Sequence, residues 1–434
     1  MEYIDEFLDF IKYSKSQYHA CEYVKNELIK DGFIELNENE EFNIKCGNKY
    51  FFTRNKSSIF AFTIPNNLDN IGINITAAHL DSPTLKLKPN ALFEKNGYYC
   101  LDTEVYGGPI YSSFTDRPLD ISGRVFIKNK DVIESKLFSF DKGVCSIPNL
   151  CIHFNREINK GFEYNTQENL IPILCKKEKE LDFNELISEK LNVNKDDILS
   201  FDLSVSVLDR GQKTGLNDEF VMSPQIDNLE CSYALYKAIL GGIGPNINVV
   251  ALFDNEEIGS RTRQGAQSTV LKDTLDRILD SLKISKEKKN IIYSNAFMIS
   301  ADNAHAFHPL YPQKYDSVNR SYLNGGVVIK SSARGCYTTD GLSMAIFKNL
   351  CEMSNSKYQL MSNRSDVLGG STLGCLSLEQ LSIPTVDIGL PQLSMHSSYE
   401  MAGSYDIIDL IKVIKKFYEI KINTLSDSKI KIGE

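Results

Sequence analysis

The stretch "INVVALFDNEEIGSR", from Ile247 to Arg261, joins an apolar segment of strand length to three closely spaced carboxylates. A continuous apolar run of this length indicates a strand buried on both faces, so Asp254, Glu256 and Glu257 stand at the edge of a core. Neighbouring residues of an extended strand point to opposite faces. Glu256 and Glu257 can therefore serve one site only if the chain turns there, and Gly259 favours such a turn.

The chain around this stretch alternates between apolar, strand-like runs and amphipathic helical segments. A helical pattern over residues 4–31 ends at an Asp-Gly signal that is typical of a helix C-terminus. After residue 222, strand-like runs such as "AFMISAD" and "PTVDIGLP" alternate with helical segments, and the last helix extends from about Asp406 to Lys421. Strands that alternate with helices predict an α/β fold, in which a mixed sheet is flanked by helices.

Residues 87–221 differ from the rest, because they consist of β-rich segments with Gly and Pro breaks. A chain of 434 residues exceeds the size at which one hydrophobic core stops growing, so we expect two domains. Residues 1–86 and 222–434 form the α/β domain in this interpretation, and residues 87–221 form a β-rich domain inserted into it.

Composition narrows the class of protein. With 42% apolar residues, 24% charged residues and a net charge of −9, the sequence is typical of a globular protein that binds neither nucleic acid nor an anionic membrane. The N-terminus is acidic where a signal peptide is basic, and no apolar run reaches the length of a membrane span, so we expect a cytoplasmic location. The ten scattered cysteines indicate reduced thiols and lack the paired spacing of a zinc-thiolate site.

Residues of metal-ligand types follow the predicted strands, where binding sites of open α/β sheets are found. Besides the acids after residue 253, this set comprises His79, Asp81, Asp302, His305 and His396, with Asp227 just before a helix. Histidines with carboxylates and no cysteine suit Zn²⁺, Mn²⁺ or Co²⁺. Two such ions bridged by a carboxylate can activate water and polarise a carbonyl, while a free glutamate acts as general base. Taken singly, each residue also fits a solvated loop or a helix N-cap, so the interpretation depends on their conjunction.

Five motifs resemble, in order and spacing, the metal-binding segments of the M18 aminopeptidases, the aspartyl aminopeptidase family. They are "AAHLDSPTLKLKP", "SPQIDNLECSY", "FDNEEIGSRTRQGA", "SADNAHAFHP" and "LPQLSMHSSYEMAG". The resemblance implies a metallo-exopeptidase domain with an inserted lid or dimerisation domain, and two divalent ions per subunit, most simply zinc. It assigns His79 and Asp302 to one metal, Glu257 and His396 to the other, and Asp227 to both.

The same resemblance implies roles for the remaining site residues. Glu256 is the expected general base, and Asp81 orients His79 as a supporting carboxylate. Lys330 reads an acidic side chain of the peptide substrate, with His305 nearby, and His153 of the inserted domain reaches the site of a neighbouring subunit. The family forms dodecamers, so we expect a homo-oligomer.

Departures from the family pattern lie near the substrate rather than among the metal ligands. This chain has "HPLYPQKYD" where many relatives have "HPNYxxKHE", "ARGCYTT" where they tend to have "NQRYAT", and Tyr399 where they have Arg. The preference for acidic N-terminal residues is therefore less firmly implied than peptidase activity. The alternatives are a neutral-residue aminopeptidase, a di-zinc carboxypeptidase or deacylase, and a non-catalytic metal-containing assembly or peptide-binding protein.

Overall fold

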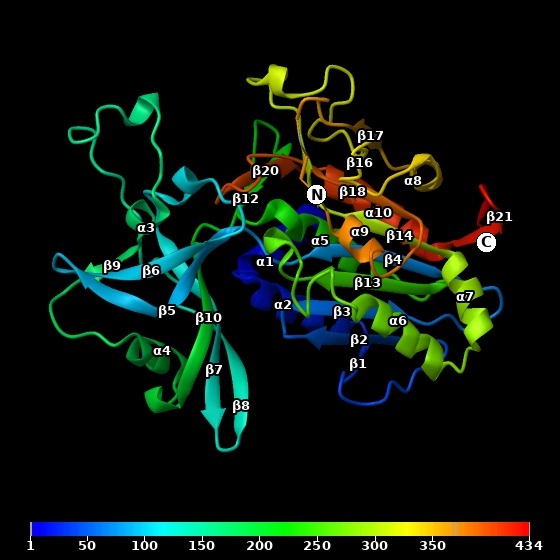
Figure 1. The fold of residues 1–434 in the computed structure, drawn as a ribbon, viewed down its shortest axis with the longest axis horizontal. Helices are drawn as coiled ribbons and strands as arrows, with labels where there is room; N and C mark the ends of the chain where they lie inside the picture. The colour runs from blue at the N-terminus through cyan, green and yellow to red at the C-terminus, as the bar shows by residue number, and fades with distance from the viewer. Residues whose placement is uncertain (1, 368, 371, 434) are drawn as a thin grey trace.

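A mixed sheet forms the centre of the molecule, and it has nine strands within residues 2–367, 369–370 and 372–433, which the computed structural model describes (Figure 1). Four parallel strands lie at its middle, in the order β13 (Ile247–Phe253), β4 (Ile73–His79), β14 (Ala296–Ala301) and β18 (Thr385–Gly389). The flanking strands are β1 (Ile34–Glu35), β2 (Lys49–Arg54) and β3 (Ser58–Thr63) on one side, and β16 (Val327–Lys330) and β17 (Tyr358–Met361) on the other. Every residue of β13 is buried, as its apolar run predicts.

Helices cover both faces of this sheet, so the predicted α/β class is confirmed. One face packs against α1 (Glu2–Tyr13), α2 (Gln17–Lys30), α5 (Ile226–Ile239), α8 (Gly341–Ser354) and α10 (Asp406–Glu419). The other packs against α6 (Val270–Ser281), α7 (Lys286–Ser294) and α9 (Leu373–Leu378). Alternation along β13 explains the two layers, since Val250 and Leu252 join the first core whereas Val249 and Ala251 join the second.

The N-terminal helical pattern of residues 4–31 is divided in the structure into two helices. The break falls at residues 14–16, and Ser16, with an extended backbone (φ −151°, ψ 167°), begins the second helix. Serine has a lower helix propensity than the residues on either side, which favours a break at this point; the Ser16 side chain makes no capping hydrogen bond. The hydroxyl of Ser16 lies 2.8 Å from Nδ1 of His19, one turn into α2.

A second sheet stands beside the first and is antiparallel throughout (Figure 1). Its strand order is β8 (Val132–Ser139), β7 (Leu119–Asn129), β10 (Ile198–Val207), β5 (Thr84–Lys95), β6 (Tyr98–Tyr106) and β9 (Ile173–Lys176), with α3 (Thr166–Asn169) and α4 (Phe183–Leu191) attached. It has its own apolar core. Strand pairing assigns residues 84–207 to this sheet, and the division of the chain into domains at residues 87 and 221 stays a prediction.

A small third sheet joins the chain leaving the second sheet to segments around the site. Its order is β11 (Gln212–Thr214), β12 (Phe220–Ser223), β20 (Glu400–Gly403), β19 (Pro391–Leu393) and β15 (Ala304–His305). A terminal hairpin of β21 (Lys421–Ser426) and β22 (Lys429–Gly433) follows α10.

No helix in the described chain is long and apolar enough to cross a lipid bilayer. All ten cysteines are free thiols.

Candidate active site

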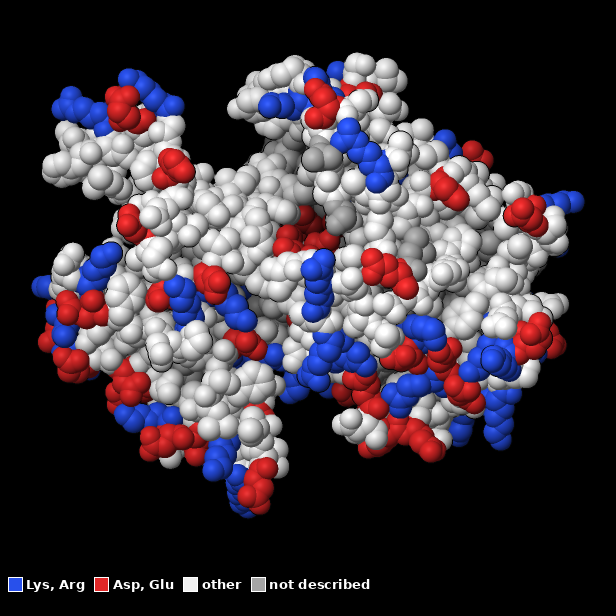
Figure 2. All heavy atoms as spheres, in the orientation of Figure 1, with Lys and Arg blue, Asp and Glu red and all other residues white. Residues whose placement is uncertain are grey.

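The carboxyl ends of the central strands carry most of the predicted site residues. His79 is the last residue of β4, and Asp302 directly follows β14. Glu256 and Glu257 begin the 3-10 turn η4 (Glu256–Ile258), two residues beyond β13. Since these strands are parallel neighbours, their carboxyl ends meet at one edge of the sheet. Figure 2 shows a hollow near the middle of this view, with acidic atoms on its floor.

Three overlapping groups of ligand-type side chains converge at this edge. Within each group, the nitrogen and oxygen atoms on offer lie within 4.8 Å of one another. The groups are His79 with Asp227 and Asp302, Asp227 with Glu257 and His396, and His79 with Glu256 and Glu257. The structure thus brings together six residues that are up to 317 positions apart in the chain.

Asp227 lies between the two histidines, and each carboxylate oxygen faces one of them. Its Oδ1 is 3.6 Å from Nε2 of His79, and its Oδ2 is 3.5 Å from Nε2 of His396. Oδ1 is buried and lacks a hydrogen-bond partner in the described structure. The backbone of Asp227 is extended (φ −78°, ψ 110°), although the residue falls within α5. Two ligand groups therefore share one buried carboxylate.

Both histidines turn the same ring nitrogen toward this carboxylate. Nδ1 of His79 lies 3.0 Å from the carbonyl oxygen of Asp81, and Nδ1 of His396 lies 3.0 Å from the carbonyl oxygen of Gly108. A carbonyl accepts only from a protonated nitrogen, so each Nδ1 carries hydrogen. In a neutral ring, Nε2 is then free to act as a ligand, which is the usual arrangement at metal sites.

The turn after β13 brings both glutamates to one site, in agreement with the sequence-based expectation, and gives them different neighbours. Asn255 and Gly259 both adopt positive φ values, 65° and 90°, on either side of η4. Glu257 thereby approaches His396, with Oε2 3.5 Å from Nε2, whereas Glu256 joins only the group around His79. Glu257 therefore lies in a ligand group with Asp227 and His396, whereas Glu256 does not.

Asp81 supports two parts of the site, of which the sequence analysis predicted only one, the orientation of His79. Its backbone carbonyl accepts the hydrogen bond from His79, while its Oδ1 lies 3.4 Å from the same nitrogen. The carboxylate accepts the backbone N–H groups of Glu256 (3.1 Å) and Glu257 (3.2 Å). Asp81 therefore fixes the turn that carries both glutamates as well as the ring of His79.

Negative charge is crowded at this edge. Burial and nearby carboxylates, Asp302 and Asp81 among them, raise the pKa of Glu256 to about 8, although the charge of His79 acts to lower it. Burial and Asp227 raise the pKa of Glu257 well above its usual range. Burial opposes the protonation of His79, yet its carboxylate partners raise its pKa well above that of free histidine. The acids use the histidines as their only counter-charges within the three ligand groups.

The donor set fits divalent metal ions. Buried carboxylates at this density need cations to offset the cost of removing them from water. Oxygen and imidazole donors without thiolate suit zinc, manganese or cobalt, and the orphaned Oδ1 of Asp227 leaves one ligand atom unused by the protein.

The other predicted residues lie at different distances from this cluster. Lys330, at the end of β16, is only 3% exposed, and its Nζ lies 3.9 Å from Oδ2 of Asp302. His305, in β15, is exposed to solvent, but surrounding protein and Lys330 lower its pKa. His153 is exposed in a turn of the second sheet's long loop. Asp254 is buried outside the three groups and accepts the backbone N–H of Asn255.

Two supporting residues were not among those predicted from the sequence. Glu400 is buried, and it accepts the backbone N–H groups of Asp227 (3.0 Å) and His396 (2.7 Å), so it holds two ligand segments together. Tyr106, at the end of β6, donates its hydroxyl to Asp81. Glu400 lies within a quoted motif, four residues after His396, and the Gly-Gly-Pro break that follows Tyr106 was a further signal.

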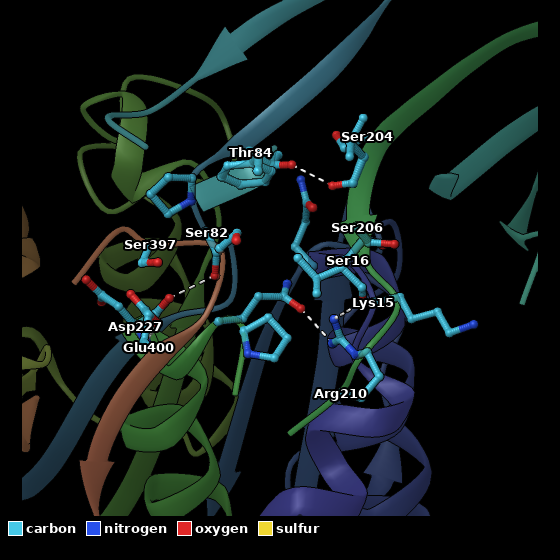
Figure 3. A pocket seen from close by; sticks show the side chains of 18 residues that line it. Lys15, Ser16, Ser82, Thr84, Ser204, Ser206, Arg210, Asp227, Ser397 and Glu400 are labelled. Carbon is cyan, nitrogen blue, oxygen red and sulfur yellow. Dashed lines mark hydrogen bonds between the residues drawn. The ribbon is translucent and has the colours of Figure 1, made fainter. Parts of the chain in front are cut away.

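A cavity of about 40 Å³ lies beside Asp227, at the junction with the second sheet (Figure 3). Its walls include Ser82, which donates to the Asp227 carbonyl, together with Arg210, Ser206 and Glu400. This volume suits a few water molecules and is too small for a peptide.

Comparisons with known proteins agree with this geometry. The family model described as "Aminopeptidase I zinc metalloprotease (M18)" matches residues 10–418. The chain is 42% identical over 429 residues to the probable M18 family aminopeptidase 2 of Clostridium novyi, covering 97% of this chain and 99% of that protein. It is 37% identical over 466 residues to the aspartyl aminopeptidase of Dictyostelium discoideum, covering 95% and 96% respectively.

Among solved structures, that of the S. cerevisiae mApe1 dodecamer superposes with a TM-score of 0.83 at 25% sequence identity. The superposition covers 96% of each chain. The similarity therefore includes both the central sheet and the β-rich segment beside it.

Proposed function

Because the chain belongs to the M18 family of zinc metalloproteases and is a zinc-dependent aminopeptidase, we propose that it uses two metal ions to hydrolyse the peptide bond after the N-terminal residue. His79 and Asp302 would hold one ion, Glu257 and His396 would hold the other, and Asp227 would contribute to both. The observation that carries this proposal is the orientation of Asp227, whose two oxygens each face a different histidine at 3.5–3.6 Å.

Glu256 is the general base of the proposed reaction. It is the glutamate that belongs to no group with Asp227, so it keeps a carboxylate free for proton transfer. Zinc bound at the site supplies a Lewis acid that polarises the scissile carbonyl and makes water more acidic. Glu256 takes a proton from the attacking water as the new C–O bond forms, and returns it to the amine nitrogen as the C–N bond breaks.

We further propose that Lys330 selects acidic N-terminal residues. A buried ammonium beside the ligand groups offers charge-assisted hydrogen bonds to a carboxylate of the substrate. The name of the Dictyostelium discoideum relative, aspartyl aminopeptidase, supports this specificity. The peptide would then place its scissile bond at the metals and its first side chain at Lys330.

The active form is proposed to be a homo-oligomer, by analogy with the S. cerevisiae mApe1 dodecamer. The second sheet serves as the dimerisation or lid domain, and exposed His153 on its loop is free to reach a neighbouring subunit. The assembly is expected in the cytoplasm, where reduced thiols match the ten free cysteines.

The decisive test replaces Glu256 with Gln, which keeps the shape of the side chain and removes the base. Glu256→Gln should retain two zinc ions per subunit by elemental analysis and lose about 10²- to 10⁴-fold in kcat. Glu134→Gln, an exposed substitution on β8, serves as the matched control. Near-normal turnover of Glu256→Gln would disprove the assignment.

Two further measurements test the metal arrangement and the reaction class. Asp227→Asn should lower the affinity for both ions together, whereas Asp302→Asn should affect one. Peptides acetylated at the N-terminus should resist cleavage, because an aminopeptidase needs the free amine. Cleavage of these blocked peptides would instead indicate a carboxypeptidase or a deacylase.

A further inference from the structure

The segment Tyr106–Gly108 leaves the second sheet at the end of β6 and runs along the edge of the ligand groups. Tyr106 hydrogen-bonds to Asp81 and Gly108 to His396, and Gly107 lies beside Glu257, where an added Cβ would be too close. We propose that this segment positions the catalytic turn and one metal ligand, so that the second sheet is a working part of each subunit's own active site. The inference rests on the function proposed above for Glu256 and the metal ligands.

The hydroxyl of Tyr106 is the first of these contacts. It donates to Oδ2 of Asp81 at 2.7 Å and accepts from Nδ2 of Asn255 at 2.9 Å. Burial and the adjacent Asp81 raise the pKa of Tyr106, so the phenol keeps its proton and remains a donor. The hydroxyl therefore links the second sheet to Asp81 and to Asn255, at the start of the turn after β13.

Asp81 transmits this contact to the general base. Its Oδ1 accepts the backbone N–H of Glu256, and its Oδ2, which Tyr106 also contacts, accepts that of Glu257. A carboxylate held by three donors has little freedom to rotate. Removing the hydroxyl takes away one of the two hydrogen bonds to Oδ2, so the Asp81 carboxylate and the backbone that carries Glu256 are held less firmly. Tyr106 is thus a positioning residue that acts through Asp81.

Gly107 and Gly108 lie near Glu257 and His396, the proposed ligands of the second metal ion. Gly107 adopts a φ of +70°, and a Cβ there would lie 3.1 Å from Cβ of Glu257, so the close approach favours glycine. The carbonyl of Gly108 accepts from Nδ1 of His396, and the backbone N–H of Ile110 donates to the His396 carbonyl at 2.9 Å. The segment thereby fixes the ring that offers Nε2 to the metal.

The first test is Tyr106→Phe, which removes only the hydroxyl. We expect kcat to fall about 10- to 100-fold because a displaced general base loses alignment, while KM changes less than twofold and zinc content stays at two per subunit. Tyr98→Phe, at an exposed position on the same strand, should behave as the unmodified protein. A normal kcat, or a fall that only parallels zinc loss, would overturn the proposal.

A double substitution separates positioning from a general structural effect. If Tyr106 acts through Glu256, Tyr106→Phe should cost nothing further in the Glu256→Gln background. A full additional loss would overturn that link. Should Glu256→Gln itself remain active, the proposed function fails, whereas failure of the inference alone leaves Glu256→Gln inactive and Tyr106→Phe normal.

Gly107→Ala tests the second set of contacts without using activity. The added methyl group should displace Glu257 and lower the affinity for one of two zinc ions at least 10-fold, as measured by chelator competition. Thermal unfolding of the zinc-free protein shows whether the variant folds. If it does not fold, the Tyr106→Phe series decides the proposal. Unchanged affinity for both ions in a folded variant would count against the role of Gly107.

Discussion

Nζ of Lys330 lies 3.9 Å from Oδ2 of Asp302, so a buried cation stands next to a predicted metal ligand. The ring of Tyr337 lies 5.6 Å from the same nitrogen. Burial opposes the charge, but Asp302, Tyr337 and Asp387 together raise the pKa of Lys330, which therefore stays protonated. In the proposed function Asp302 would bind a metal ion, which would leave this ammonium to pair with the substrate.

Lys330→Met should consequently change specificity more than chemistry. The loss of a charge-assisted hydrogen bond, worth about 1.5–3 kcal/mol, predicts a roughly 10- to 100-fold fall in kcat/KM for aspartyl reporter substrates. Activity on leucyl substrates should change little. Lys348→Met on α8 provides the control. A preference of the unmodified protein for leucyl substrates would contradict the assignment of acidic specificity.

Gly389→Ala should impair zinc binding through the backbone. A Cβ at Gly389 in β18 would meet the carbonyl oxygen of Asp302 at 1.9 Å, so the strand that presents this ligand must move. Gly244→Ala is a matched control, because its Cβ would meet the carbonyl of Tyr418 at the same distance, away from the ligand groups. Both variants should unfold at lower temperature, and only Gly389→Ala should also lose zinc affinity. Equal zinc binding by the two variants would contradict this prediction.

His19→Gln should reveal one source of acid sensitivity. Burial, with Lys15 and Arg210 nearby, lowers the pKa of His19 to about 4. The unfolded chain therefore binds a proton between pH 6.5 and 4 that the folded protein excludes, so protonation favours unfolding as the pH falls. This difference amounts to about 3 kcal/mol.

The measurement is urea unfolding of both proteins at pH 7.5 and pH 4.5. Stability of the unmodified protein should fall more steeply over this interval than that of His19→Gln. An identical fall in the two proteins would show that His19 does not titrate with unfolding.

Local sequence determined the central strands and indicated the candidate ligands at their ends. A fully apolar run such as β13 can only be buried on both faces, and parallel strands place the residues at their carboxyl ends along one edge of the sheet. The turn that carries Glu256 and Glu257 could likewise be predicted, because Gly259 lies within the same short segment. The break between α1 and α2 was missed, since the apolar spacing continues across Ser14 and Ser16.

Only the tertiary structure decided which groups hold the ligands in place. The contacts of Tyr106 with Asp81, of Gly108 with His396 and of Glu400 with Asp227 join residues 25, 288 and 173 positions apart. Hydrogen bonds of this kind depend on how one sheet packs beside another, and neither periodicity nor residue type records that packing. The sequence by itself thus determined the chemical groups of the site, while the packing of the three sheets against one another determined which groups support them.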